Sequence, residues 1–541
     1  MKMKSFNRKF FFFTSIGLLV LGTNRADAQK ANVQKKPNIV FILADDLGHH
    51  AISINGLKYA KTPNIDAIGQ GGVNFTQHYV SAPMCCASRA GILTGRYQQR
   101  FGSENHLLYP AGSAYNYDKD KQAGLNLLML EKTDDLTAAD VTYTQGIPKT
   151  ETNIAELLKR NGYATAIIGK WHQGYYAGYR PHERGFDYSW GWYGGSSLYY
   201  TDSVKPGYTS FRDSLGQLHN YGGEGGKYQW RRDSLVTGIY KNGQLTDESD
   251  YTTYAIAREA VNFIDQNKDR PFFLYVPFGA IHTPLQALQK NWDKSDNIKN
   301  PQIRYVIAML LSLDEAVGQI TKKIKDDGLE DNTIIVFSGD NGATYNRFSL
   351  QFKNGKPVMG GPTTYDDQYE NLNLPLKGGK MTHYEGGIRT PLLIKWPAKI
   401  KTGITYNSPI SALDLYSTFA AAAGAPLPKE HQYDGVNLVD YVNGNKKGQP
   451  HPILYWRNGF VKTIRKGDYK LMINELDKTL YLYNLSNDPY EQHDLAPSLP
   501  AKVQELRKDF QDWEKGLVPP RWKSGGVNPV IVDGKVVSYQ I

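Results

Sequence analysis

Short apolar runs alternate along this chain with segments of helical period. The apolar runs are residues 38–44, 164–168, 272–278 and 333–338. Runs of this length, rich in β-branched residues, are typical of strands buried on both faces of a sheet. Between them, apolar spacing of three and four predicts helices over 152–160, over 254–264 and from Ile303 to near Gly328. This order predicts an α/β fold with a large mixed, mainly parallel sheet sandwiched by helices.

The pattern changes in two regions. Residues 174–250 are rich in Gly, Tyr and Trp, which predicts either an insertion that lines a cleft or irregular surface loops. From about Ile453, short runs such as 469–473 and 480–485 alternate with turns and predict a smaller antiparallel sheet. We therefore expect a large α/β domain over 29–448 and a small C-terminal α+β domain over 449–541.

The first 28 residues have the features of a secretory signal peptide. Four basic residues precede an apolar run over 10–21, and Ala26-Asp27-Ala28 offers a cleavage site. The run is too short for a comfortable membrane span, no cysteine follows it to carry a lipid, and no later stretch reaches the length of a span. With two cysteines in 541 residues, this predicts a bacterial periplasmic or secreted protein without stable membrane insertion.

The charge of the chain argues against nucleic acid as a partner. The net charge is +10, and removal of residues 1–28, with five basic groups and one acidic group, leaves about +6. No dense block of Lys and Arg is present. The charge therefore fits steering of an anionic substrate, or simply a solvated surface, better than binding to a duplex.

Polar residues follow each of the four predicted strands. In chain order they are Asp45, Asp46, Lys170, His172, His282, Asp340 and Asn341. In open α/β sheets, ligands bind beyond the carboxyl ends of the strands. Asp and Asn are hard oxygen ligands, which calcium or magnesium prefers, although the same residues are also common in solvent-facing turns. Asp45 and Asp46 can converge only if the strand has already ended, because neighbouring strand side chains point opposite ways.

The two cysteines, Cys85 and Cys86, are adjacent. Neighbouring α-carbons are about 3.8 Å apart, too close for a relaxed disulfide between them. A zinc site would need further thiol or imidazole ligands nearby. A helix over 87–93 would place Cys85 near a helix N-terminus, where anions are favoured, with Arg89 one turn on. Buried, inert thiols are the alternative interpretation.

The segment Cys85-Cys86-Ala87-Ser88-Arg89, followed by Leu93-Thr94-Gly95-Arg96, resembles the signature of the type I sulfatases of the alkaline phosphatase superfamily. The resemblance implies an alkaline phosphatase-like fold and sulfuric ester hydrolysis. It also implies that a formylglycine-generating maturation enzyme converts Cys85 to formylglycine (3-oxoalanine). Cys86 falls at the variable position of the signature.

The resemblance also implies roles for the polar residues at the strand ends. The implied ligands of a divalent cation, usually Ca²⁺ with Mg²⁺ as the alternative, are Asp45, Asp46, Asp340 and Asn341, with position 85 beside them. The implied catalytic set is Cys85, Arg89, Lys170, His172, His282 and Lys380. Within it we assign His282 as the general acid, with Lys380 as runner-up, and His172 as the base. Taken singly, a core histidine or a solvated lysine is the ordinary interpretation. Glu385 and Arg389 are interpreted as structural, as a salt bridge.

The expected substrate is a sulfated saccharide, such as a glycosaminoglycan or mucin-type fragment with a galactose or N-acetylgalactosamine sulfate. Candidate substrate contacts are Arg100, Glu104, Asn105, His106, His182 and Trp190, together with Trp192 and Tyr193, although loop aromatics often pack rather than bind. Two alternatives are kept. One is a phosphate or phosphonate ester hydrolase of the same superfamily, and the other is a catalytically silent sugar-binding homologue.

Overall fold

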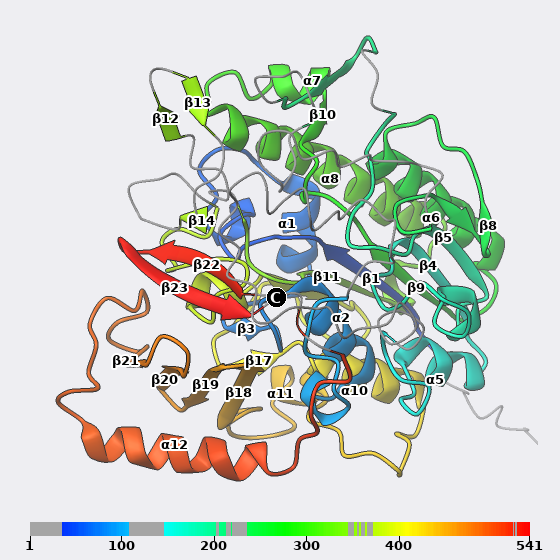
Figure 1. The fold of residues 1–541 in the computed structure, drawn as a ribbon. Helices are drawn as coiled ribbons and strands as arrows, with labels where there is room; N and C mark the ends of the chain where they lie inside the picture. The colour runs from blue at the N-terminus through cyan, green and yellow to red at the C-terminus, as the bar shows by residue number, and fades with distance from the viewer. Residues whose placement is uncertain are drawn as a thin grey trace, which may run out of the picture. The chain divides into compact units, whose positions relative to one another are not determined.

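The central feature of the fold is a ten-stranded sheet with strand order β16-β2-β15-β11-β1-β9-β4-β5-β7-β8 (Figure 1). It is seen in a computed structural model that describes residues 35–107, 145–201, 205–212, 218, 235–344, 351–353, 356–358, 363–364, 372–522, 524 and 527–540. The predicted signal peptide lies outside the described residues.

The four predicted strands form the middle of this sheet. They are β1 (Asn38–Ala44), β4 (Ala164–Lys170), β9 (Phe272–Pro277) and β11 (Thr333–Gly339). β1 pairs in parallel with β11 on one side and β9 on the other, and β9 pairs in parallel with β4. The predicted mainly parallel sheet is therefore confirmed.

The outer strands make the sheet mixed. β5 (Tyr188–Trp192) is parallel to β4, whereas β15 (Leu392–Lys395) is antiparallel to β11. The remaining strands of the sheet are β2 (Val73–Phe75), β7 (Tyr240–Lys241), β8 (Gln244–Leu245) and β16 (Ile404–Tyr406). The region predicted as an insertion or loops thus contributes β5, β7 and β8 to the main sheet. Their short length, and the glycine inside β5, left no strand period to recognise in the sequence.

Alternate residues of β1 pack into two different cores. Val40 and Ile42 face α1 (Pro63–Gln70), α6 (Thr252–Asn267) and α8 (Pro301–Asp326). Ile39 and Phe41 face α2 (Cys85–Thr94), α5 (Ile154–Arg160) and α10 (Asp414–Ala423) on the other side. Because both faces are covered, every residue of β1 is buried and apolar except Asn38. This double burial explains the continuous apolar run in the sequence.

The predicted helices are present, and side chains cap two of them at their N-termini. Asn153 caps α5 by accepting hydrogen bonds from the backbone of Ala155 and Glu156, and Glu156 returns a bond to the Asn153 N–H. Asn300 caps α8 by accepting hydrogen bonds from the backbone of Gln302 and Ile303, with a proline at the first helical position. Such caps satisfy amides that the helix itself leaves unpaired.

The C-terminal region contains the predicted antiparallel sheet. Its strands are β18 (Ile453–Asn458), β19 (Val461–Lys466), β20 (Tyr469–Asn474) and β21 (Thr479–Asn484). The helix α12 (Pro500–Glu514) packs Leu506 and Phe510 against them. A last hairpin, β22 (Val527–Val532) and β23 (Lys535–Gln540), joins β14 (Thr363–Thr364), as the red arrows in Figure 1 show.

The minor elements complete the described chain. They are η1 (Ser53–Asn55), β3 (His78–Tyr79), η2 (Gln98–Arg100), η4 (Pro181–Glu183), β6 (Tyr208–Ser210), β10 (Gln286–Leu288), α7 (Gln289–Asp293), η5 (Glu330–Asn332), β12 (Gln351–Lys353), β13 (Lys356–Val358), α9 (Glu385–Ile388), β17 (Ile410–Ser411) and α11 (Leu438–Val442). Across the described ranges, no helix is both long and apolar enough to cross a membrane.

Gly169 offers a test of how closely β4 and β9 must approach. Its φ is 132°, and an added Cβ would lie 2.0 Å from the carbonyl oxygen of Pro277. We expect Gly169→Ala to lower the free energy of unfolding by more than about 4 kcal/mol, because backbone has to move. Gly162→Ala is the matched control. Its φ is also positive, at 83°, but nothing lies within 4 Å, so a loss of about 1 kcal/mol is expected. Equal losses in urea titrations would contradict the steric explanation.

Candidate active site

The first two acidic residues of the site follow β1 directly. β1 ends at Ala44, and Asp46 has a φ of 59°. The strand has therefore ended before Asp45, so the side chains of Asp45 and Asp46 are able to converge. The backbone N–H of Asp46 donates to the Asp340 carboxylate at 3.1 Å. Since Ala44 and Gly339 are paired in register, Asp45 and Asp340 each follow the end of neighbouring parallel strands.

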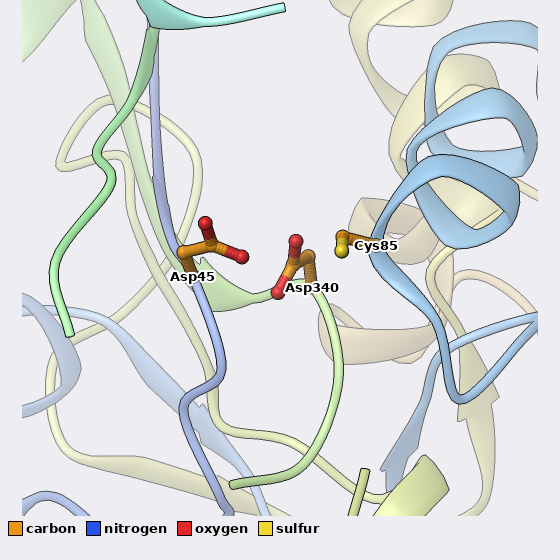
Figure 2. A group of neighbouring side chains, drawn as sticks. All are labelled: Asp45, Cys85 and Asp340. Atoms are coloured by element: carbon orange, nitrogen blue, oxygen red, sulfur yellow. The ribbon is translucent and has the colours of Figure 1, made fainter. Parts of the chain in front are cut away.

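Cys85 is the first residue of α2, beside these carboxylates. Figure 2 shows the Cys85 thiol facing Asp340, with Asp45 beyond it. One ligand atom from each of the three residues lies within 4.8 Å of the others, and all three are buried. Burial raises the pKa of the Cys85 thiol, and Lys170 and Lys380 only partly oppose this. The thiol is therefore protonated rather than a ready thiolate. Neither Cys85 nor Cys86 is in a disulfide.

Two buried cations offset the charge of Asp45 and Asp340. The ammonium of Lys170, at the end of β4, lies 2.6 Å from the Asp45 carboxylate. The guanidinium of Arg89, from α2, lies 2.8 Å from Asp340 and 3.6 Å from Asp45. All four side chains are fully buried. Burial raises the pKa of Asp340 to about 6 although Arg89 lowers it, so without the charge of Arg89 this pKa would be higher still.

Asp46 forms a second centre next to the first. The ammonium of Lys380 lies 2.7 Å from its carboxylate, and the side-chain amide of Asn341 donates to it at 2.8 Å. The Nε2 atom of His282 is 3.8 Å away. Burial would raise the pKa of Asp46, but Lys380 and His282 together hold it below its ordinary value. Thr344, which the sequence reasoning missed, also donates to this carboxylate at 3.2 Å.

These residues fit a hard divalent cation. Within the described residues, Asp45 Oδ1 and Asn341 Oδ1 are buried and accept no hydrogen bond. Buried oxygen acceptors are rarely left without a partner. Together with the carboxylate of Asp340, which clusters with Asp45 and Cys85, these two oxygen atoms form a donor set of the kind that calcium and magnesium take. The carboxylate of Asp46 would complete it.

Two histidines border the cluster. His172 is buried, and neither ring nitrogen has a hydrogen-bond partner among the described residues. Burial, with the charge of Lys170, lowers the pKa of His172 well below its ordinary value, so its ring is neutral. Nδ1 of His282 lies 2.7 Å from the carbonyl oxygen of Thr283. A carbonyl can only accept, so Nδ1 carries the hydrogen and Nε2 is directed towards Asp46.

Three of the predicted substrate contacts bind other parts of the protein. Arg100 pairs with Asp434 at 2.7 Å, and Glu104 pairs with Arg457 at 2.6 Å. Asn105 donates to the Trp522 carbonyl at 2.8 Å. These three side chains are committed to contacts within the protein, so we no longer propose them as substrate contacts.

Two further candidates also pack rather than face the site. Trp190 lies in the core on the α6 side of the sheet, and the ring of His182 lies against Gly243 in the turn between β7 and β8. His106 differs from the rest, because its ring centroid is 5.2 Å from that of His172. Trp192 lines a small pocket together with His282. His106 and Trp192 therefore remain candidates.

The predicted Glu385–Arg389 salt bridge is present, with 3.8 Å between its closest atoms. The closer partner of Glu385 is Lys470 of β20, at 2.9 Å, which also pairs with Glu491 at 2.8 Å. All three members of this second network are buried. Sequence reasoning missed Lys470 and Glu491 because no local signal connects residues so far apart in the chain.

The fold and this site together define a hydrolase of the alkaline phosphatase-like class. A family model described as Sulfatase matches residues 37–425, and one described as N-sulphoglucosamine sulphohydrolase, C-terminal, matches residues 379–515. The chain belongs to the sulfatase family and is a sulfuric ester hydrolase. The resemblance and the fold class predicted from sequence are confirmed.

Individual relatives agree with the family. Arylsulfatase G of Mus musculus is 30% identical over 489 residues, covering 85% of this chain and 78% of the relative. The solved structure of Ps i-CgsB is 33% identical, with a TM-score of 0.71, covering 90% of this chain and 95% of that one. A second structure of it, in complex with k-i-k-neocarrahexaose, is 32% identical with the same TM-score and coverage. A phosphonate monoester hydrolase of Agrobacterium radiobacter, at 16% identity and a TM-score of 0.56 over 89% of this chain and 96% of its own, shares the fold alone.

The cation site can be tested by binding. We expect Asp45→Asn to weaken Ca²⁺ binding by about 100-fold or more, because a charged oxygen ligand is lost. Isothermal titration of Ca²⁺ into protein freed of metal by a chelator measures this. Asp314→Asn is the matched control, since Asp314 caps α1 instead of facing the cluster. Calcium binding that is unchanged in Asp45→Asn would rule out the site.

Proposed function

We propose that this chain is an exported carbohydrate sulfatase whose nucleophile is a formylglycine at position 85, held beside a divalent cation. The observation that carries the proposal is the convergence of Cys85 with Asp45 and Asp340 at the N-terminus of α2. An unmodified Cys85 fits the role poorly, because burial raises the pKa of its thiol. A thiol also lacks the second hydroxyl that is needed to release sulfate.

Hydrated formylglycine would supply a geminal diol, with one hydroxyl as the nucleophile towards sulfur and the other as the group whose loss of a proton lets sulfate leave. A bound cation supplies Lewis-acid polarisation of oxygen. Asp45, Asp46, Asp340 and Asn341 would hold it. Calcium is our first choice because four oxygen donors from two loops make a flexible set, and magnesium is the alternative.

The side chains around position 85 provide the remaining functions. Lys170 and Lys380 place two positive charges where sulfate oxygens gain negative charge, in a buried setting that strengthens the attraction. Arg89 is anchored by Asp340 and by the Lys170 carbonyl, so it holds α2 in register with the sheet. His172 accepts the proton of the second hydroxyl at a ring nitrogen.

The leaving oxygen of the sugar needs a proton, and we assign this step to His282. Burial and Lys380 lower the pKa of His282, and its Nδ1–H is directed to Thr283. His282 therefore acts as an acid only after Nε2 gains a proton, which the negative charge of a bound sulfate favours. Lys380, which carries its proton at rest, is the runner-up.

Two observations support a carbohydrate substrate. A structural neighbour at 32% identity was solved with k-i-k-neocarrahexaose, whose name denotes a hexasaccharide. The predicted signal peptide fits export to where sulfated glycans occur. Within this class we propose a galactose or N-acetylgalactosamine sulfate. The proposed domains are 29–448, catalytic, and 449–541, C-terminal.

Conversion of Cys85 can be checked by mass spectrometry. We expect the peptide that contains Cys85 and Cys86 to carry one formylglycine, at position 85, when the chain is coexpressed with a maturation enzyme. Cys85→Ala should lower kcat by about 10⁴-fold or more, because the nucleophile is lost. Cys86→Ser is the matched control and should leave kcat within about twofold, since Cys86 packs towards Asn105. A free thiol at position 85 in fully active enzyme would refute the assignment.

The reaction and the substrate can be tested in one panel. We expect the matured enzyme to hydrolyse aryl sulfate at least about 100-fold faster than aryl phosphate. Among defined sulfated saccharides, we expect release from galactose or N-acetylgalactosamine sulfates, scored by the position that loses sulfate. A faster rate on phosphate or phosphonate esters would favour the related hydrolases that share the fold. Binding of sulfated glycans without any release would favour a silent homologue.

A further inference from the structure

The end of the chain lies beyond both matched family segments but contacts the active site. We call residues 518–522 together with the β22–β23 hairpin the C-terminal strap. The two family models end at residues 425 and 515, so neither of them covers this strap. In the described part of the chain, however, it contacts the segments that carry Cys85, His106 and Lys380.

The apolar side of the strap packs against the neighbours of two catalytic residues. Met84, which precedes Cys85, and Met381, which follows Lys380, share one buried cluster with Val530, Val532 and Tyr539 of the hairpin. The backbone N–H of Met381 also donates to the Pro83 carbonyl at 2.9 Å. The hairpin therefore covers the place where the Cys85 and Lys380 segments meet.

A second set of contacts holds residues 99–106. The indole N–H of Trp522 donates to the His106 carbonyl at 2.9 Å. The side-chain amide of Asn105 donates to the Trp522 carbonyl at 2.8 Å, and Gln540 donates to the Asn105 side chain at 2.8 Å. Trp522 is 7% exposed, so its bond to His106 is shielded from water. Loss of the donor would remove this shielded hydrogen bond.

The segment held in this way positions a ring against His172. The rings of His106 and His172 meet edge to face at 5.2 Å. His172 has no hydrogen-bond partner on either nitrogen among the described residues, so its orientation depends on packing. We propose that Trp522 is a positioning residue, which fixes His106 and through it the ring of His172. This inference rests on the proposed role of His172 as the base.

A double-mutant cycle on the full-length, matured enzyme tests the inference. Trp522→Phe keeps most of the ring volume and removes only the N–H donor. We expect it to lower kcat on an aryl sulfate about tenfold and KM in proportion, with kcat/KM within about twofold, because His172 acts in the release of sulfate, after the aryl alcohol has left. His106→Ala should lower kcat at least as much. The double variant should match His106→Ala alone, since Trp522 then has no ring left to position.

Controls separate positioning from stability. Val536→Ala, at a side chain on the same hairpin that is 62% exposed, should leave kcat and KM unchanged. The melting temperature of each variant is measured by circular dichroism, and kcat is remeasured at a temperature where every variant is folded. An unchanged kcat in Trp522→Phe, losses that multiply in the double variant, or a loss that vanishes at low temperature would each overturn the inference. Failure of the unmutated enzyme to release sulfate would instead overturn the proposed function.

Discussion

The site depends on the burial of three carboxylates at the ends of two adjacent parallel strands. Like charges in a medium of low dielectric repel strongly unless positive groups lie among them. Here the positive groups come from separate elements: Arg89 from α2, Lys170 from the end of β4, and Lys380 from the loop before α9. The pairing of β1 with β11 places Asp45 beside Asp340, so a change in sheet register would separate the charges that stabilise one another.

The C-terminal region is part of the same electrostatic arrangement. Lys470 of β20 lies buried between Glu385 and Glu491 and thereby joins the C-terminal sheet to α9, five residues after Lys380. Removing one member of a buried ion pair leaves an uncompensated charge, which is strongly destabilising. The C-terminal sheet thus holds α9 in place through charge. The strap holds the Cys85 and His106 segments in place through packing and hydrogen bonds.

Prediction from sequence succeeded where a local pattern reflected burial. β1 was predicted with its observed bounds and β11 to within one residue, because strands covered on both faces are continuously apolar. β5 was missed, since a five-residue strand with an internal glycine has no such pattern. The sequence shows the charges of Arg100 and Glu104 but not their partners, Asp434 and Arg457, which lie more than 300 residues away.

The sequence by itself determined the class of the protein, the order of its elements and which residues cluster around Cys85. It could do so because the motif residues follow buried strands, and the apolar pattern of such strands is local. Only the tertiary structure decided which polar residues face the cluster and which pair elsewhere. It also revealed that the chain end reaches His106. Those outcomes depend on contacts between segments far apart in the chain, and such contacts are set by packing rather than by any local preference.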